Sequence, residues 1–184
     1  MEQNKISIEN KLKILLNLLE RKFNREITLE SVKKEFQISN EENIMIINYG
    51  LEKAYNEKNN DSVDSLVFAI YTFELFTEKL IEILCKLSKE EWHGKHEDIA
   101  SYFQKIKSPK TIECIYELAI SDFEKYRWDD NFALVRKCCF ALGDINTPKA
   151  KKKLELIMKN TNEETIKEHV MEQLNMCDFS NKDI

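Results

Sequence analysis

The sequence predicts an all-α fold, an α-solenoid in which pairs of helices repeat along the chain. Only 3 of the 184 residues are Gly and 2 are Pro, and apolar residues follow helical spacing through most of the chain. The two prolines, Pro109 and Pro148, lie 39 positions apart, and the same offset relates apolar positions on both sides of them. The related positions are Ile99 with Cys138, Tyr102 with Ala141, Phe103 with Leu142, Ile115 with Leu154, and Leu118 with Ile157. A period of about 40 residues with helical spacing is typical of solenoids built from two-helix units.

The helices around the prolines can be placed from caps and apolar spacing. We expect them over residues 95–106, 109–123, 131–143, 147–159 and 163–175. Ser108 and Thr147 each precede a proline, which is typical of a helix start because Ser and Thr cap the N-terminus and Pro suits the first turn. Gly143 is expected to end its helix in the left-handed conformation. The predicted core positions of the repeats are Leu142, Ile145, Ile99, Phe103 and Ile106.

The first half of the chain is predicted to be a helical extension of the repeats. Residues 1–60 hold amphipathic segments that follow Ser or Thr caps and are expected to pack on the repeats. The apolar stripe over residues 62–88 fits either one long helix or two helices separated by a kink. Residues 61–184 are expected to hold this segment and the repeats, within a single continuous domain of about nine helices that ends in a frayed tail after Cys177.

Composition and charge narrow the classes of function. The formal net charge is -5, whereas nucleic-acid binders usually carry a basic surplus, so nucleic acid is not an expected partner. No apolar run approaches the roughly 20 residues that cross a bilayer, so no membrane contact is expected. The five cysteines are an odd number without a secretory signal, which predicts reduced, mostly buried thiols in a cytoplasmic protein. The abundance of Lys, Asn, Glu and Ile indicates a bacterial source.

Residues 134–145, which read Leu-Val-Arg-Lys-Cys-Cys-Phe-Ala-Leu-Gly-Asp-Ile, resemble the second helix of a HEAT-like repeat. The pattern of that helix is a Val-Arg pair, small residues, then Ala-Leu-Gly and an aliphatic residue. Cys138 and Cys139 stand where the family usually has alanines. The resemblance to HEAT-like repeats covers residues 95–175. Pro148, Ala150, Leu154 and Ile157 resemble the first helix of the next unit. The order Trp-His, His-Glu-Asp-Ile, Ser-Pro and Ala-Leu-Gly is also similar to small bacterial HEAT-repeat immunity proteins encoded beside secreted toxins. This resemblance implies a protein-binding module that neutralises a cognate toxin.

The connection over residues 121–130 is the candidate protein-binding segment, because it combines aromatic and acidic residues. The expected contact residues are Tyr126, Trp128, Asp129 and Asp130, joined by Trp92 and His93. Tyr, Trp and Arg are enriched at interface hot spots, and loops on a rigid scaffold often carry function. In the alternative, Tyr126 and Trp128 fold over the ends of neighbouring helices. The acidic net charge would suit a basic partner such as a nuclease toxin domain.

His93, His96 and Glu97 form the most chemically suggestive spacing in the chain. At i, i+3 and i+4 they would share one face of a helix and could bind a divalent metal ion. Gly94 disfavours a helix through His93, and no fourth ligand is evident. The alternative is that these residues belong to a helix start, where acidic side chains are favourable.

The sequence contains no Gly-rich phosphate loop and no evident pairing of a nucleophile with a base. We therefore predict no catalytic residue, no cofactor and no enzyme activity. Two alternatives to an immunity protein stay open. One is a HEAT-like DNA-binding protein or DNA glycosylase, in which Trp128 would stack and Asp129 or Asp130 would stabilise positive charge on the sugar. The other is a general scaffold or regulatory solenoid.

Overall fold

The computed structural model describes residues 2–126 and 128–183, and the regular structure in these ranges is entirely helical. The all-α prediction is confirmed, with ten α-helices in the described ranges where about nine were expected. The chain divides into two compact units. Unit 1 holds the chain up to Ile83 together with Trp92–Lys95, and unit 2 holds Leu84–Glu91 and the chain from His96 onward. The prediction of a single domain, with residues 1–60 packing on residues 61–184, stays a prediction.

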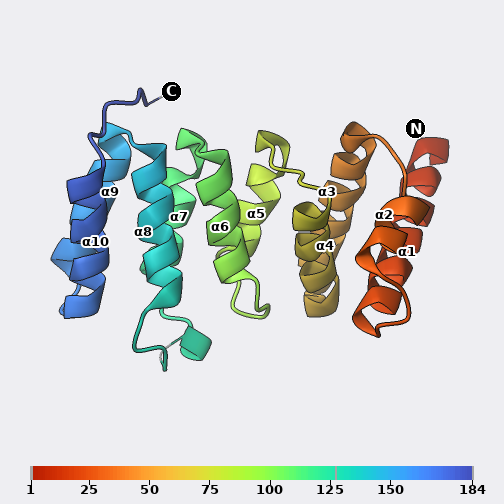
Figure 1. Ribbon diagram of the computed structural model, residues 1–184, viewed down its shortest axis with the longest axis horizontal. Coiled ribbons are helices and arrows are strands. Elements are labelled where there is room, and N and C mark those ends of the chain that lie inside the picture. Colours follow the sequence, from red (N-terminus) through yellow and green to blue (C-terminus); the bar gives the residue numbers. More distant parts are fainter. Residues whose placement is uncertain (1, 127, 184) are drawn as a thin grey trace. The chain divides into compact units, whose positions relative to one another are not determined.

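Unit 1 is built mainly from four α-helices. They are α1 (Glu2–Phe23), α2 (Leu29–Glu35), α3 (Asn40–Glu57) and α4 (Asn60–Thr72), followed by a 3-10 turn (Glu78–Leu80) and by α5 (Ile81–Leu87), which crosses the division between the units. Helix α1 packs against α2, α3 and α4 (Figure 1). The unit has an aliphatic core that includes Leu15, Leu19, Ile46, Ile47, Leu51, Leu66 and Ile70, all fully buried. Thr28, Ser39 and Asn59 cap the starts of α2, α3 and α4 with side-chain oxygens.

The segment 62–88 is two helices, so the interpretation as one long helix is wrong. Helix α4 ends because Glu74 adopts a left-handed conformation, with a φ of 54°. This turn lets the Leu75 main-chain N–H donate to the Ile70 carbonyl at 2.9 Å, and it buries the Leu75 side chain. Lys58 ends α3 in the same left-handed way, with a φ of 51°. Glycine usually occupies such positions, so neither helix end carries its usual sequence signal.

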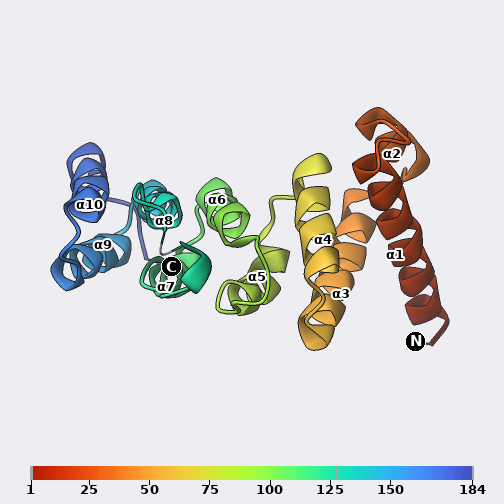
Figure 2. The ribbon, with the colours of Figure 1, turned by 90° about the horizontal axis from the view of Figure 1, so that it is seen from below.

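The described part of unit 2 contains five further α-helices. They lie in two layers (Figures 1 and 2). They are α6 (His96–Ile106), α7 (Ile112–Ala119) with a preceding 3-10 turn (Pro109–Thr111), α8 (Ala133–Ile145), α9 (Pro148–Asn160) and α10 (Glu164–Met176). Helices α6, α8 and α10 form one layer, and α7 and α9 form the other (Figure 2). Helix α8 packs against α6, α7, α9 and α10, and is therefore the centre of the unit.

The 39-residue offset is visible in the backbone of unit 2. Helices α6 and α8 end at positions related by this offset, and the next residue of each, Lys107 or Asn146, is left-handed, with a φ of 48° or 59°. A proline then begins the next helical segment in both copies. Ile99, Phe103, Leu142 and Ile145 are buried as predicted, whereas Ile106 is only half-buried. Thr147 caps α9 as predicted, but Ser108 makes no capping hydrogen bond through its side chain.

Gly143 does not end α8, so that prediction is wrong. It lies inside the helix, and a Cβ atom built on it would be 2.3 Å from Oε1 of Gln173 on α10. The absence of a side chain at Gly143 leaves room for Gln173, so this glycine serves the packing of α8 against α10 rather than a turn. Asn146 takes the left-handed position instead, which suits Asn better than most non-glycine residues.

The tail after Cys177 is ordered, which corrects the expectation of fraying. Asn146 holds it through three groups: its Oδ1 accepts from the Phe179 N–H at 2.6 Å, its Nδ2 donates to Asp178 at 2.8 Å, and its carbonyl accepts from the Asn181 N–H at 2.9 Å. The Phe179 side chain is buried. The hydrogen bond from Asn146 holds the pKa of Asp178 below its ordinary value.

Two cysteines of unit 2 are bonded to each other, so the expectation that all thiols are reduced is wrong. Cys85 of α5 and Cys114 of α7 form a disulfide with their Cα atoms 5.5 Å apart. Cys138 and Cys139 are buried in the core of α8 as predicted, and burial raises the pKa of both thiols, that of Cys139 to about 12. No helix of the described residues is both long enough and apolar enough to cross a bilayer.

Candidate protein-binding site

The candidate segment is the α7–α8 connection, which we define as residues 120–126 and 128–132; Arg127 lies outside the described residues. It is longer than predicted, because α7 ends at Ala119 and α8 begins at Ala133. Its only regular element in the described residues is the 3-10 turn Glu124–Tyr126. Figure 1 shows the connection extending past the lower ends of α7 and α8.

The connection is tied to the rest of unit 2 at three places. The Glu124 main-chain N–H donates to the Glu91 carboxylate at 3.0 Å, and the Lys125 ammonium donates to the Glu91 carbonyl at 2.8 Å. On the opposite side, Nε2 of His169 on α10 donates to the Asn131 carbonyl at 3.0 Å. These contacts hold Glu124 and Lys125 against the turn between α5 and α6, and hold Asn131 against α10.

The third tie joins Tyr126 to the start of α6. His96 is fully buried, and its Nε2 lies 2.9 Å from the Glu90 carbonyl. A carbonyl can only accept, so Nε2 carries a proton, and when the ring is neutral Nδ1 accepts from the Tyr126 hydroxyl at 3.3 Å. The Phe123 ring packs on His96 with 4.6 Å between ring centroids. Tyr126 therefore lies against the start of α6, as in the alternative in which it folds over the end of a neighbouring helix.

Burial is the main cause that raises the pKa of Tyr126 to about 12, and the negative charges of Glu97 and Asp98 contribute to that rise. The phenol therefore stays protonated at neutral pH and continues to donate to His96. Its role in the described structure is to anchor the connection, and its half-buried ring leaves only part of the surface for a partner.

Asp129 caps α8 from within the connection. Its Oδ2 accepts from the Ala133 N–H at 2.7 Å, and its Oδ1 accepts from the Asn131 N–H at 3.1 Å. The residue directly before α8, Phe132, is left-handed with a φ of 48° and provides no side-chain cap. Asp129 thus satisfies a helix N–H that would otherwise lack a partner.

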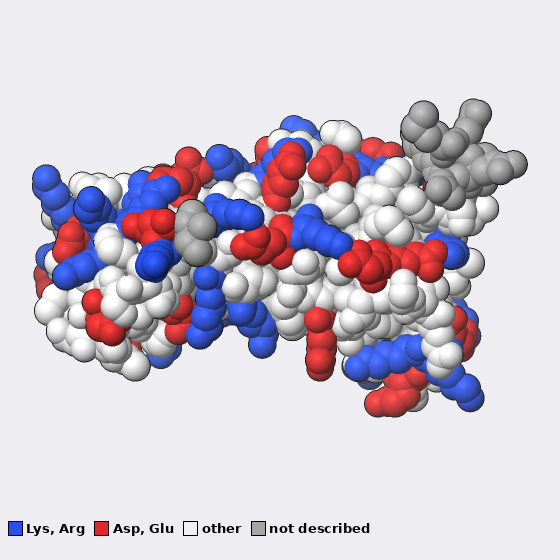
Figure 3. All heavy atoms as spheres, turned by 90° about the horizontal axis from the view of Figure 1, so that it is seen from above, with Lys and Arg blue, Asp and Glu red and all other residues white. Residues whose placement is uncertain are grey.

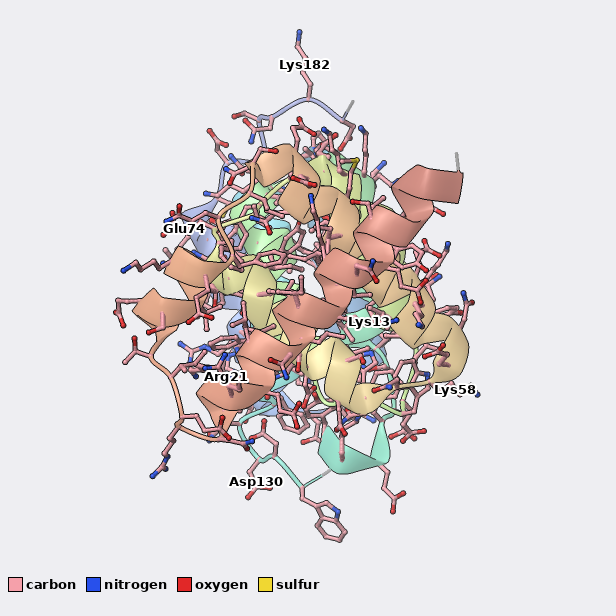
Figure 4. The ribbon with its side chains drawn as sticks, turned by 90° about the vertical axis from the view of Figure 1, so that its right-hand side faces the viewer. Lys13, Arg21, Lys58, Glu74, Asp130 and Lys182 are labelled. Carbon is pink, nitrogen blue, oxygen red and sulfur yellow. A yellow bond between two sulfur atoms is a disulfide. The ribbon has the colours of Figure 1, made fainter. Side chains whose placement is uncertain are left out.

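Trp128 and Asp130 are the predicted contact residues that face solvent. The Trp128 side chain is 88% exposed, more than any other large apolar side chain in the described part of the chain. Asp130 is exposed too, and Figure 4 shows it projecting away from the helices. Tyr126 and Asp129, which flank this part of the connection, are hydrogen-bonded inward, whereas the indole of Trp128 is exposed.

A groove lies beside the connection in unit 2, and the sequence patterns did not indicate it. It has a volume of about 490 Å³, within the range of ligand-binding clefts. Its apolar lining includes Leu118, Ile120, Phe123, Phe132, Ile157 and Ile166, and its acidic lining is Asp122, Asp129 and Glu163. We call it the connection groove. It brings together residues from α7, α8, α9 and α10 that are up to 48 positions apart in the sequence.

Trp92 and His93 belong to unit 1. His93 is almost fully buried, with its Nδ1 accepting from the Lys95 N–H at 3.1 Å, and the half-buried Trp92 ring packs edge-on against it. Their assignment as contact residues stays a prediction, since the structure places neither in the α7–α8 connection.

The residues considered as metal ligands are engaged in other contacts. Helix α6 begins at His96, so His93 lies outside it, and Glu97 pairs with Lys137 at 3.0 Å. Among the described residues, no group of three or more His, Cys, Asp or Glu side chains is placed to hold a metal ion.

Basic and acidic side chains are mixed on the face shown in Figure 3. The basic run that begins α9 is partly paired, because Lys149 and Lys153 both contact Glu113, at 3.1 Å and 2.7 Å. The hydrogen bond from Lys153 lowers the pKa of Glu113, against the opposing effect of its slight burial. Lys151 lies over the Phe179 ring at 5.8 Å.

Comparisons of the chain with family models, with curated proteins and with solved structures found no match.

Proposed function

We propose that this chain is a non-catalytic protein-binding module in which the helices of unit 2 form a HEAT-like α-solenoid. The observation that supports this most strongly is the display of Trp128 at 88% exposure on a connection tied down at Glu91, His96 and His169. An exposed indole on a mobile loop would cost entropy to order upon binding. The hydrogen bonds of Glu124, Tyr126 and Asn131 restrain the backbone around Trp128 and reduce that cost, which favours a binding role for the indole.

The partner that fits best is a basic toxin domain, and the chain would act as its immunity protein. The net charge of -5 favours approach by a basic protein, and Asp130 beside Trp128 adds a negative charge at the proposed contact. The immunity role itself rests on the resemblance of residues 92–145 to HEAT-repeat immunity proteins of bacteria.

Co-expression tests this function directly. The toxic domain is taken from the secreted protein encoded in the neighbouring reading frame, and cell survival is measured with and without this chain. Survival that depends on the chain, and that falls in a folded Trp128→Ala variant, is the expected result. Equal killing with and without the chain would end the immunity proposal, and full protection by Trp128→Ala would place the contact elsewhere.

Two further binding experiments address the alternative functions. Salt-sensitive binding to duplex DNA with release of a base would support a glycosylase. Binding to a non-toxic protein from the same operon would support a scaffold.

The cytoplasmic location expected from the sequence is also part of this proposal. It requires Cys85 and Cys114 to be reduced in the cell, because reducing compartments rarely retain structural disulfides. Alkylation of thiols in freshly lysed cells, followed by mass measurement, decides between five free cysteines and three.

A further inference from the structure

We propose that the connection groove binds an apolar side chain of a partner segment that carries Lys or Arg next to it. This inference rests on the proposed protein-binding function and adds the chemistry of the bound segment. The groove, rather than Trp128 alone, would then select the partner.

The lining of the groove supports an apolar anchor. Aliphatic side chains from four helices and aromatic side chains from the connection form it, and its lining residue Ile120 is 50% exposed. Burial of an exposed aliphatic side chain by a bound partner is favourable, since it removes apolar surface from water. A volume of about 490 Å³ has room for one large side chain together with part of the backbone that carries it.

The charges around the groove support a basic neighbour for that anchor. Asp122, Asp129 and Glu163 line the groove, and its described lining residues include no Lys or Arg. Asp129 is used in capping α8, whereas Glu163 makes no ion pair within the described part of the chain. Carboxylates at the edge of an apolar site favour a segment with cations on either side of its anchor and disfavour an acidic one.

Charge also argues against a second copy of this chain as the occupant. A copy would bring its own net charge of -5 toward the acidic edge of the groove. A self-association that required the groove would show as a dimer, so it is one of the outcomes below.

Titration with short peptides tests the inference without the natural partner. The probe is acetyl-Gly-Lys-Phe-Lys-Gly-amide, and its two controls replace both Lys by Glu or the Phe by Ser. Amide chemical shifts of ¹⁵N-labelled full-length chain are followed by NMR. We expect saturable shifts around the groove with the Lys-Phe-Lys peptide, and dissociation constants at least about tenfold higher for both controls. Equal binding of all three peptides, or shifts outside the groove, overturns the inference.

Matched variants assign the binding to the groove. Ile120→Ser and Glu163→Lys should each raise the dissociation constant of the Lys-Phe-Lys peptide at least about fivefold. Leu156→Ser and Glu168→Lys change an exposed apolar residue and an exposed acid outside the groove and should leave it unchanged. Circular dichroism verifies folding, and a failure of the groove variants to weaken binding refutes the site. A dimer by light scattering that Ile120→Ser dissociates would make a second copy the occupant and would also refute it.

The two proposals can fail separately. If the peptide binds in the groove but the chain gives no protection against the toxin, the immunity function fails and the groove stands. If protection requires Trp128 while Ile120→Ser and Glu163→Lys protect fully and bind the peptide normally, the function stands and the groove inference fails.

Discussion

Removal of the Cys85–Cys114 disulfide should lower the free energy of unfolding of the oxidised chain by about 3–4 kcal/mol. The two cysteines are 29 residues apart in the sequence. Closing a loop of that length removes about 12 cal/mol/K of entropy from the unfolded chain, which corresponds to about 3.6 kcal/mol at 25 °C. Because the bond ties α5 to α7 within unit 2, its loss also permits α5 to separate from that unit more easily.

The assay is urea unfolding followed by far-UV circular dichroism. It compares the oxidised chain, the same chain with reductant, and the double variant Cys85→Ala with Cys114→Ala. Cys177→Ala, which removes a cysteine outside the disulfide, is the control and should change the free energy by less than about 0.5 kcal/mol. Identical transitions for the oxidised and reduced chains, or alkylation of five cysteines in the purified chain after oxidation, would refute the reasoning.

Three further outcomes follow from the structure. Leu142→Ala should lower the free energy of unfolding by about 2–5 kcal/mol because Leu142 is fully buried at the centre of unit 2, and a loss below about 0.5 kcal/mol in urea would contradict this. Lys58→Gly should raise the free energy of unfolding by about 0.5 kcal/mol. Glycine relieves the left-handed strain at a φ of 51°, and this gain exceeds the cost of its greater freedom in the unfolded chain. The control Met45→Gly, at an exposed position inside α3, should lower the free energy of unfolding by about 1 kcal/mol. Tyr126 has a folded pKa raised to about 12 from 10.0, so the stability it contributes is fully present below pH 10 and is lost as the pH rises toward 12. The buried thiols of Cys138 and Cys139 lose stability in the same direction, so urea melts across that range should show a larger loss in the natural chain than in Tyr126→Phe.

The arrangement of unit 2 was predictable where local signals mark it. Prolines after Ser or Thr, a recurring apolar pattern and a 39-residue offset predicted the end of α6 and the start of α9, whereas α8 ends at Ile145 rather than at the predicted residue 143. These signals act over one or two helical turns, and the backbone follows them. The cap by Asp129 had such a signal too, because an acidic residue shortly before a predicted helix is a common capping residue.

The remaining features depend on partners that are distant in the sequence. The disulfide joins residues 29 positions apart, and Tyr126 meets His96 across 30 positions, so neither pairing has a local pattern. The prediction for Gly143 was wrong because the residue that fills the space beside it, Gln173, lies on another helix. The helix end at Glu74 lacks the glycine that usually marks it, so only tertiary structure shows where α4 stops.

The candidate site was predicted in composition but not in geometry. The acidic and aromatic character of the α7–α8 connection singled it out, and the exposure of Trp128 agrees with a contact role. Residue types could not predict which residues stabilise the connection and which are available to a partner, since an Asp can either cap a helix or contact another protein. The hydrogen bonds show that Tyr126 and Asp129 hold the connection in place, while Trp128 and Asp130 face solvent.

The affinity of the purified complex with the toxin domain, measured for Trp128→Ala, tests the central claim most directly. An indole that is buried upon binding should make this variant at least about 30-fold weaker, equivalent to about 2 kcal/mol. Met176→Ala, at a side chain that is 71% exposed outside the connection, should bind within about twofold of the natural chain. Equal affinities for Trp128→Ala, Met176→Ala and the natural chain would contradict the claim that the α7–α8 connection carries protein binding.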